Sequence, residues 1–402
     1  MKTAGIVAEY NPFHTGHAYQ IARTRGLLGA DCAVVAVMSG NWVQRGACAA
    51  ADKCTRAGWA LAGGADLVLE LPTVWAASSA ESFATGAVAL LRACGVVDVL
   101  SFGSESGDPA ALAAAAACLD SEAYRAGLSR FLDEGMPFAA CRQAVVAALL
   151  GSERAKVLSR PNDNLGVEYL RALDRMGSAI RPVTVRREGA PHDSLLVGET
   201  PPEFLSATQL RAFLEAEDWR AAEPYLPGGG AEVLRRSWGG MPGPRRVEGG
   251  LLARLRPMTA GDWAALPDSG AAEGLPPRLE RAGKQCRSLE EFFQLAKPRH
   301  WTQARLRRLL VWAFLGLTRA DRPDAPPYLR VLGMTPTGQA ILRQAQPSLP
   351  LALRTGDFQK LGGEALALFE QEARADDLYA LSLPAPLPCG QDYTQGLIKV
   401  GF

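Results

Sequence analysis

Histidine is scarce in this sequence, and no apolar run is long enough to span a membrane. The 402 residues contain four histidines, two of which, His14 and His17, stand three positions apart in the string EYNPFHTGH. No run approaches the roughly 18 apolar residues of a membrane helix, and Glu9 and Pro12 interrupt the N-terminus before a secretory signal could build up. The sequence therefore predicts a soluble, cytoplasmic protein without a membrane partner.

Paired cysteines and a strong net charge are also missing. The eight cysteines form no CxxC pair and mostly lie in apolar runs, which is typical of reduced, buried thiols and argues against a zinc site or a disulfide framework. The formal net charge is only +1, so a protein that binds nucleic acid over its whole surface is not indicated. The hydrophobic content of 48% is ample for a globular core.

Short apolar runs that favour β-structure alternate with segments of helical length. The runs are residues 4–8, 32–38, 66–71, 96–103 and 179–187. Continuous rather than alternating apolarity indicates burial on both faces of a strand, as in a parallel sheet covered by helices. We therefore expect a doubly wound α/β domain with a parallel sheet over residues 1–220.

A stretch rich in glycine and proline separates this domain from the rest. Residues 224–250 contain eight glycines and four prolines among 27 residues, a composition that does not sustain a helix or a strand interior. Residues 221–250 are therefore predicted to be a linker or mobile loop. The pattern beyond is mainly helical, and residues 251–402 are predicted to form a second, partly basic domain.

The two N-terminal histidines lie where the first predicted strand meets the first predicted helix. Open α/β sheets bind ligands at the carboxyl ends of their strands, and helix N-termini favour anions. Gly16 lets the backbone approach a phosphate, and Pro12 restricts the entry of the chain. A phosphate site is therefore predicted here, and the alternative is a helix-capping turn with incidental histidines.

At this point the sequence resembles a known family. NPFHTGH resembles the HxGH signature of the nucleotidylyltransferase and class I synthetase superfamily, whose members attack the α-phosphate of ATP and release pyrophosphate. Further strings, among them MSGNWVQRG, SFGSESG, RPNDNLGVEYLRAL, SATQLR and KPRHWTQARLRRLL, occur in the order found in the tRNA(Met) cytidine acetate ligase family. The likeness runs from residue 4 to about residue 342, and it implies an HxGH nucleotidylyltransferase-like Rossmann domain.

The resemblance implies an ATP-dependent ligase. Acetate would be activated to acetyl-adenylate, and the acetyl group would pass to N4 of the wobble cytidine of elongator tRNA(Met). The implied substrates are acetate, tRNA and ATP with Mg2+; acetyl-CoA, a tightly bound organic cofactor, a metal held by protein side chains and a protein partner are not implied. One alternative is a nucleotidylyltransferase that makes a small dinucleotide-type cofactor. The other is a non-catalytic RNA-binding protein, and the intact His14 and His17 argue against this second alternative.

The same resemblance assigns residues. His14 and His17 would be catalytic and would stabilise the departing pyrophosphate. The implied ATP-binding residues are Val7, Ala8, Glu9, Tyr10, Asn11, Pro12, Phe13, His14, Thr15, Gly16, His17, Gly103, Asn162 and Arg187. A second group that could bind phosphate is Ser206, Thr208 and Arg211, at the start of a predicted helix with a capping box.

Several of these positions have a structural alternative. Asn162 could be only a helix cap and Arg187 only a surface charge, and PNDNLG departs from the usual PNNILG-like string, which leaves the choice of asparagine open by one or two positions. Residues 41–45 could contact the ribose, the phosphates or acetate, or could form a stabilising loop. Glu70 receives no role, and His192 in PHDS is a lone loop histidine.

The predicted tRNA-binding region is a local basic cluster. Residues 281–320 hold nine Lys or Arg against two Glu, a net of +7, with two tryptophans among them. The predicted tRNA-binding residues are Lys297, Arg299, Trp301, Arg305 and Arg308, with Arg245 and Arg246 as additional candidates. Helical spacing puts Arg305 and Arg308 on one face and points Arg307 elsewhere. The alternative is a solvated basic face.

Overall fold

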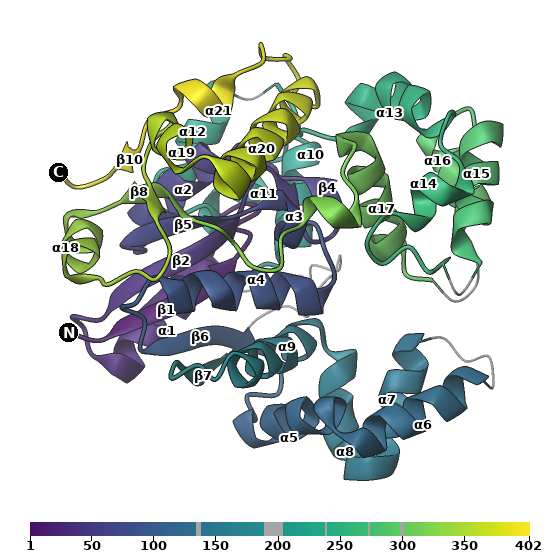
Figure 1. Ribbon diagram of the computed structural model, residues 1–402. Coiled ribbons are helices and arrows are strands. Elements are labelled where there is room, and N and C mark those ends of the chain that lie inside the picture. The colour runs from purple at the N-terminus through teal and green to yellow at the C-terminus, as the bar shows by residue number, and fades with distance from the viewer. Residues whose placement is uncertain (134–137, 189–203, 238, 272–273, 298–300) are drawn as a thin grey trace.

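The computed structural model describes residues 1–133, 138–188, 204–237, 239–271, 274–297 and 301–402. Its centre is an eight-stranded sheet in the order β10-β8-β5-β2-β1-β6-β7, with β9 paired to β8 (Figure 1). Five of these strands are mutually parallel and match the predicted apolar runs: β1 (Thr3–Ala8), β2 (Ala33–Ser39), β5 (Leu67–Leu71), β6 (Val99–Ser104) and β7 (Arg181–Arg186). The α/β fold class is confirmed.

Strand β2 shows why the sheet is covered on both faces. All seven of its residues are buried. Val35 and Val37 join one apolar core, whereas Val34, Ala36 and Met38 join another. Because successive strand side chains point to opposite faces, the two cores lie on the two faces of the sheet.

Two of the helices that cover the sheet begin at capping residues that can be identified in the sequence. Helices that contribute to the two cores include α1 (Thr15–Leu28), α2 (Lys53–Ala62), α3 (Thr73–Ala76), α4 (Ala80–Ala93), α9 (Pro161–Arg175) and α10 (Ala207–Glu215). Asp52 caps α2 by accepting from the amides of Cys54 and Thr55, and Ser206 with Gln209 forms the predicted capping box of α10.

Strand β8 (Leu329–Met334) makes the sheet mixed. It pairs antiparallel with β5 and parallel with β9 (Leu351–Ala352) and β10 (Ile398–Lys399). Helices α18 (Pro336–Gln344), α19 (Thr355–Leu361), α20 (Gly363–Leu381) and α21 (Gln391–Thr394) accompany these strands. The sheet therefore includes part of the stretch 251–402 that was predicted to be a separate helical domain, because the wholly buried β8 completes the β5 side of the sheet.

Two helical groups project beside the sheet (Figure 1). One follows β6 and comprises α5 (Pro109–Asp120), α6 (Glu122–Asp133), α7 (Phe138–Leu150), α8 (Ser152–Ala155) and η1 (Lys156–Ser159). The other, here called the helical lobe, comprises α13 (Glu248–Leu255), α14 (Ala260–Ala264), α15 (Leu275–Gln285), α16 (Leu289–Ala296), α17 (Gln303–Leu315) and η5 (Arg319–Asp321). Helix α17 ties the lobe to the sheet region, since the indole of Trp312 donates to the Ala77 carbonyl at 2.7 Å.

The glycine- and proline-rich stretch contains short helices, contrary to the prediction. Before and within it lie α11 (Trp219–Ala222), η2 (Glu223–Tyr225), α12 (Gly230–Ser237) and η3 (Pro244–Val247). Gly228 and Gly229 have positive φ angles of 67° and 75°, a turn that favours glycine, and α12 begins directly after it. The glycines therefore form turns between helices.

A buried ion network, here called the ion hub, fastens the C-terminal segment to the sheet. The Lys53 ammonium lies 2.8 Å from a Glu70 carboxylate oxygen, 2.6 Å from one of Asp376 and 2.9 Å from one of Asp392. Arg330 on β8 lies 3.0 Å from Glu70 and also pairs with Asp392. Glu70, which received no role from the sequence, thus binds both cations.

Candidate active site

The predicted nucleotide residues surround a cavity where the strand order reverses. The chain runs from β1 outward to β2 and β5, and then returns to place β6 on the other side of β1. Such a reversal opens a crevice at the carboxyl ends of the strands. The cavity there has a volume of about 410 Å3, and the predicted residues that line it are Val7, Ala8, Glu9, Tyr10, Asn11, His14, His17, Gly103, Asn162, Arg187, Ser206, Thr208 and Arg211.

Four predicted residues of the N-terminal loop lie outside this lining. Gly16 borders a small adjoining recess with both histidines, and a Cβ on it would come within 2.8 Å of the His14 ring. Phe13 is buried in the apolar core, where its ring fills the space beside Gly63. Pro12 and Thr15 do not line the cavity. Gly16 therefore makes room for an imidazole, and Phe13 anchors the loop.

The two histidines are oriented by backbone amides. His14 is the N-cap of α1, and its Nδ1 accepts from the Gly16 amide at 3.0 Å. Nδ1 of His17 accepts from the His14 amide at 3.2 Å, so the two residues form a reciprocal capping box. A nitrogen that accepts carries no proton, and the proton of each neutral ring is therefore on Nε2. The two rings lie 3.9 Å apart, centroid to centroid.

The setting keeps both imidazoles neutral. Burial, followed by the cationic Arg187 and Arg211, lowers the pKa of His14 to about 3. The pKa of His17 falls well below its ordinary value, first through loss of hydration and then through His14 and Arg187. Near neutral pH each ring is thus an uncharged Nε2–H donor beside two guanidinium groups, a set that suits a polyphosphate.

The two arginines approach the histidines from different elements. Arg187 follows β7, and its amide donates to the Ser104 carbonyl at 2.9 Å, which places it beside Gly103. A Cβ on Gly103 would lie 3.4 Å from the Arg187 side chain, so these two residues are neighbours at this edge of the sheet. Arg211 on α10 donates to the Asn11 carbonyl at 2.7 Å. The arginines therefore hold the ends of two loops and face the same cavity.

The structure distinguishes the two asparagines of RPNDNLG. Asn162 lines the cavity, and its amide side chain donates to Glu105 at 2.6 Å. Asn164 instead accepts from Arg142 at 3.0 Å and does not line the cavity. Glu105 was not identified from the sequence, although it directly follows the strand-end string SFGS. Asn162 is therefore the asparagine with access to a ligand.

Some of residues 41–45 stabilise their own loop, and others line the cavity. Asn41 is buried, with its side chain between the Lys53 amide at 2.6 Å and Asp376 at 3.0 Å, so it stabilises the loop. Gln44 and Arg45 line the cavity. The Gln44 amide donates to the Glu9 carboxylate at 2.7 Å, which connects this loop to the end of β1.

The predicted tRNA residues lie on the helical lobe at different depths. Arg305 stacks on Trp301, with its guanidinium carbon 4.0 Å from the ring centroid, and Arg308 is largely buried near Asp268. Lys297 is exposed. Arg299, like His192, lies outside the described residues. Arg307, which was not among the predicted set, is the lobe residue that lines the cavity with the histidines.

Comparison with known proteins agrees with this geometry. Residues 1–392 match the family model described as HIGH Nucleotidyl Transferase. A protein from Thermoanaerobacter sp. (strain X514) named tRNA(Met) cytidine acetate ligase is 36% identical, with 100% of each chain covered. A protein of the same name from Bacillus subtilis (strain 168) is 31% identical, with 96% of this chain and 94% of the relative covered.

Two solved structures share the fold over their whole length. The apo form I crystal structure of Thermotoga maritima TmcAL has a TM-score of 0.93 at 31% identity, and the form II structure bound with alpha-thio ATP has a TM-score of 0.90 at the same identity. Each comparison covers 100% of both chains.

Proposed function

This chain belongs to the HIGH nucleotidyl transferase family, among the tRNA(Met) cytidine acetate ligases, and we propose that it uses ATP and acetate to acetylate N4 of the wobble cytidine of elongator tRNA(Met). The observation that carries this proposal is the pair of neutral imidazoles, with Arg187 and Arg211, at the strand reversal. The TmcAL structure with alpha-thio ATP, similar over its full length, supports ATP as the nucleotide.

In the first step an acetate oxygen attacks the α-phosphorus of ATP. The new P–O bond forms while the bond between the α-phosphorus and the bridging oxygen of the β-phosphate breaks, so acetyl-adenylate and pyrophosphate result. Negative charge grows on the departing pyrophosphate, and the two Nε2–H donors with the two guanidiniums stabilise it there. Fixed donors do this without reorganising during the reaction.

In the second step N4 of the cytidine attacks the acetyl carbonyl carbon of the mixed anhydride. The C–O bond to AMP breaks, AMP leaves, and N4 loses a proton to solvent. The N4 lone pair is delocalised into the ring, so an activated acyl donor is required. Cys48 lines the cavity, but burial raises the pKa of its thiol to about 11, which keeps it protonated and a poor nucleophile. A direct transfer fits this setting.

Magnesium would enter with the nucleotide. Within the described parts of the chain, no group of three or more His, Cys, Asp or Glu side chains is placed to hold a metal ion. A cation bound mainly by phosphate oxygens needs few protein ligands. We therefore treat ATP with Mg2+ as the substrate. None of the described helices is long and apolar enough to cross a membrane.

The test is acetate-dependent exchange of pyrophosphate into ATP, together with mass-spectrometric detection of N4-acetylcytidine in tRNA(Met). His17→Asn keeps an acceptor for the His14 amide but lacks the Nε2–H donor, so we expect exchange to fall by about 100-fold or more without loss of folding. His17→Gln, whose amide can reach the Nε2 position, should recover part of the rate. Exchange that requires a mononucleotide instead of acetate would overturn the proposal in favour of a cofactor-forming enzyme.

A further inference from the structure

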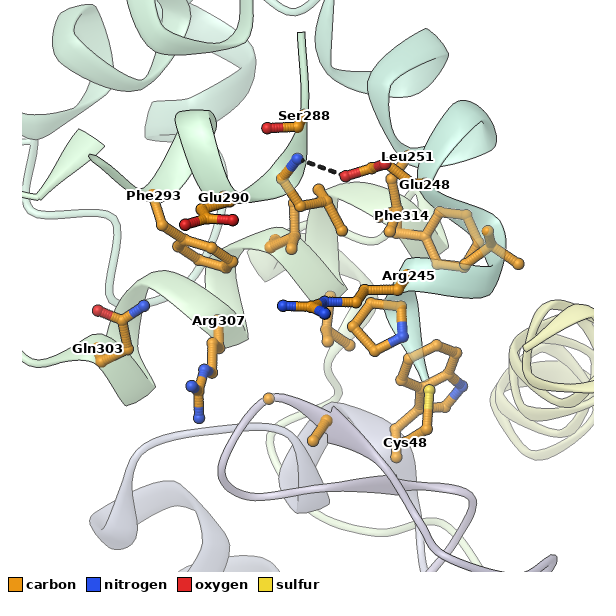
Figure 2. Close-up of a pocket in the computed structure, with 18 of the residues that line it drawn as sticks. Cys48, Arg245, Glu248, Leu251, Ser288, Glu290, Phe293, Gln303, Arg307 and Phe314 are labelled. Atoms are coloured by element: carbon orange, nitrogen blue, oxygen red, sulfur yellow. Dashed lines mark hydrogen bonds between the residues drawn. The ribbon is translucent and has the colours of Figure 1, made fainter. Parts of the chain in front are cut away.

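A second, larger cavity adjoins the one that holds the histidines. Its volume is about 860 Å3, and it lies between the helical lobe and the hairpin of β3 (Trp42–Val43) and β4 (Ala47–Cys48) (Figure 2). Ala47, Cys48 and Arg307 line both cavities. The two cavities are thus separated by little more than one hairpin and one side chain.

The hairpin tip is fitted closely against α17. Gly46 has a φ of 68°, and a Cβ on it would lie 2.4 Å from the backbone carbon of Arg307. A side chain at this position would push the lobe away from the sheet region. The close approach holds Arg307 at the junction of the two cavities.

Three cationic side chains line the second cavity. Arg245, Lys297 and Arg307 are exposed, and in the structure as described none of them forms an ion pair. In Figure 2 the guanidinium groups of Arg245 and Arg307 extend into the space between the lobe and the hairpin. Glu248 and Glu290 also line the cavity, and the Glu248 carboxylate accepts from the Leu289 amide at 2.7 Å. The three cations therefore outnumber the two carboxylates. Cations at such a surface attract phosphate groups.

The same cavity has an aromatic side. Phe293 lines it from α16 and is partly exposed, while Trp42 and Phe314 are buried behind the surface. A flat ring beside cations is the combination by which proteins bind single-stranded nucleotides, since the base stacks on the ring and the phosphate meets the charges. The volume lies within the range of ligand-binding pockets.

We propose that the second cavity binds the nucleotide adjacent to the target cytidine in the anticodon loop. This inference rests on the proposed function. The cytidine must enter the first cavity to react, and its neighbour is covalently attached, so that neighbour must lie within one nucleotide length of the junction. Its base would stack on Phe293, and its outer phosphate would meet Arg245 and Lys297. Arg307, which lines both cavities, would contact the phosphate between the two nucleotides.

Anticodon stem–loops with an abasic residue test the stacking. The nucleotide on each side of the target cytidine is replaced in turn, and the Kd of the stem–loop is measured. With the wild type, we expect one of the two replacements to raise Kd at least fivefold. With Phe293→Leu, which keeps apolar packing but lacks a flat ring, the same replacement should raise Kd less than twofold. Equal tolerance of both replacements by the wild type, or an unchanged penalty in Phe293→Leu, would overturn the proposal.

The phosphate contacts have a separate test. The double variant Arg245→Gln, Lys297→Gln should raise the KM for tRNA at least tenfold. This fold-change should be at least five times the fold-change in the rate of acetate-dependent exchange. Lys360→Gln is the matched control, because Lys360 on α19 is also exposed but lines neither cavity, and its KM for tRNA should stay within twofold. If exchange is absent from the wild type, the proposed function fails before this inference is reached.

A small nucleotide is the alternative occupant, and it gives a different result. Free CMP and AMP are added to the exchange assay with the wild type and with Arg245→Gln. If Arg245→Gln alters the response to a free nucleotide while the Kd of the stem–loop stays unchanged, the cavity is a small-molecule site and the proposal is overturned. We expect the Kd of the stem–loop to rise and the response to free nucleotide to stay the same.

Discussion

The ion hub and the second cavity use the same kinds of side chain in opposite ways. In the hub, Lys53 and Arg330 are buried and each lies within 3.0 Å of at least two carboxylates. In the cavity, the lysine and arginines are exposed and, over the described part of the chain, form no ion pair. A cation that is surrounded by carboxylates in the interior holds elements together. A cation that forms no ion pair and lies beside a cavity can instead bind an anionic group of a ligand.

The ion hub contains more buried carboxyl groups than buried cations. Beside its two cations lie the carboxyl groups of Glu70, Asp392, Glu372 and Asp376. Burial, followed by the neighbouring Glu70, raises the pKa of Glu372 to about 8. Burial also raises the pKa of Asp376 to about 7 despite the nearby Lys53. Bound protons thus reduce the excess of negative charge in the interior.

The largest effect should come from removing a hub cation. Lys53→Met leaves three carboxylates without their shared partner, and we expect the free energy of unfolding to fall by about 3–5 kcal/mol in urea titrations. Lys284→Met is the matched control, because Lys284 pairs with Glu280 at the surface, and its unfolding midpoint should hardly move. Similar midpoints for the two variants would remove the distinction between hub and surface pairs.

A smaller effect should appear in the pH dependence of stability. The folded pKa of Glu372 lies above the ordinary value of 4.5, so between about pH 4.5 and 8 the folded state holds a proton that the unfolded state has lost. The contribution of Glu372 to the free energy of unfolding is fully present below about pH 4.5 and is lost as the pH rises towards 8. Glu372→Gln mimics the protonated form, so wild type should lose on the order of 2 kcal/mol relative to the variant between pH 6 and pH 8.

Urea unfolding of both proteins at several pH values measures this difference. The contribution of the histidines, whose pKa values are lowered, cancels because both proteins contain them. Parallel pH profiles would show that Glu372 is ionised in the folded hub.

The next effect concerns the junction between the cavities. Arg307→Gln should weaken tRNA binding about tenfold at low salt and reduce the slope of log Kd against log salt by about 1, as expected for one lost phosphate contact. The measurement is filter binding of tRNA over a range of salt concentrations. An unchanged slope would exclude Arg307 from the RNA interface.

The smallest effect separates two arginines of α17. The Arg305 guanidinium is already engaged, since it donates to the Asp268 carbonyl at 2.7 Å and stacks on Trp301. Arg305→Gln should therefore change the Kd for tRNA by about twofold, less than Arg307→Gln does. A larger effect for Arg305 than for Arg307 would support the RNA-binding face predicted from helical spacing, which contains Arg305 and Arg308. The RNA would then lie across the lobe instead of at the cavities.

Much of the lining of the cavity that holds the histidines could be predicted, because these residues follow strand ends or begin helices. His14 opens α1, Gly103 lies near the end of β6, Arg187 follows β7 and Ser206 caps α10, and parallel strands bring such positions to one edge. Within the loop, Pro12, Phe13, Thr15 and Gly16 do not line the cavity, and Phe13 packs into the core instead. A contiguous motif does not reveal which of its side chains points into the core.

The sequence alone determined the parallel strands, the capping boxes and the position of the imidazole pair, because these depend on local apolar patterns and on neighbours three or four residues apart. Only the tertiary structure decided that Lys53 meets Asp376, that β8 runs antiparallel beside β5 and that Arg307 reaches the junction of two cavities. These contacts join residues hundreds of positions apart. The packing of whole elements determines which of them meet, and no local pattern records it.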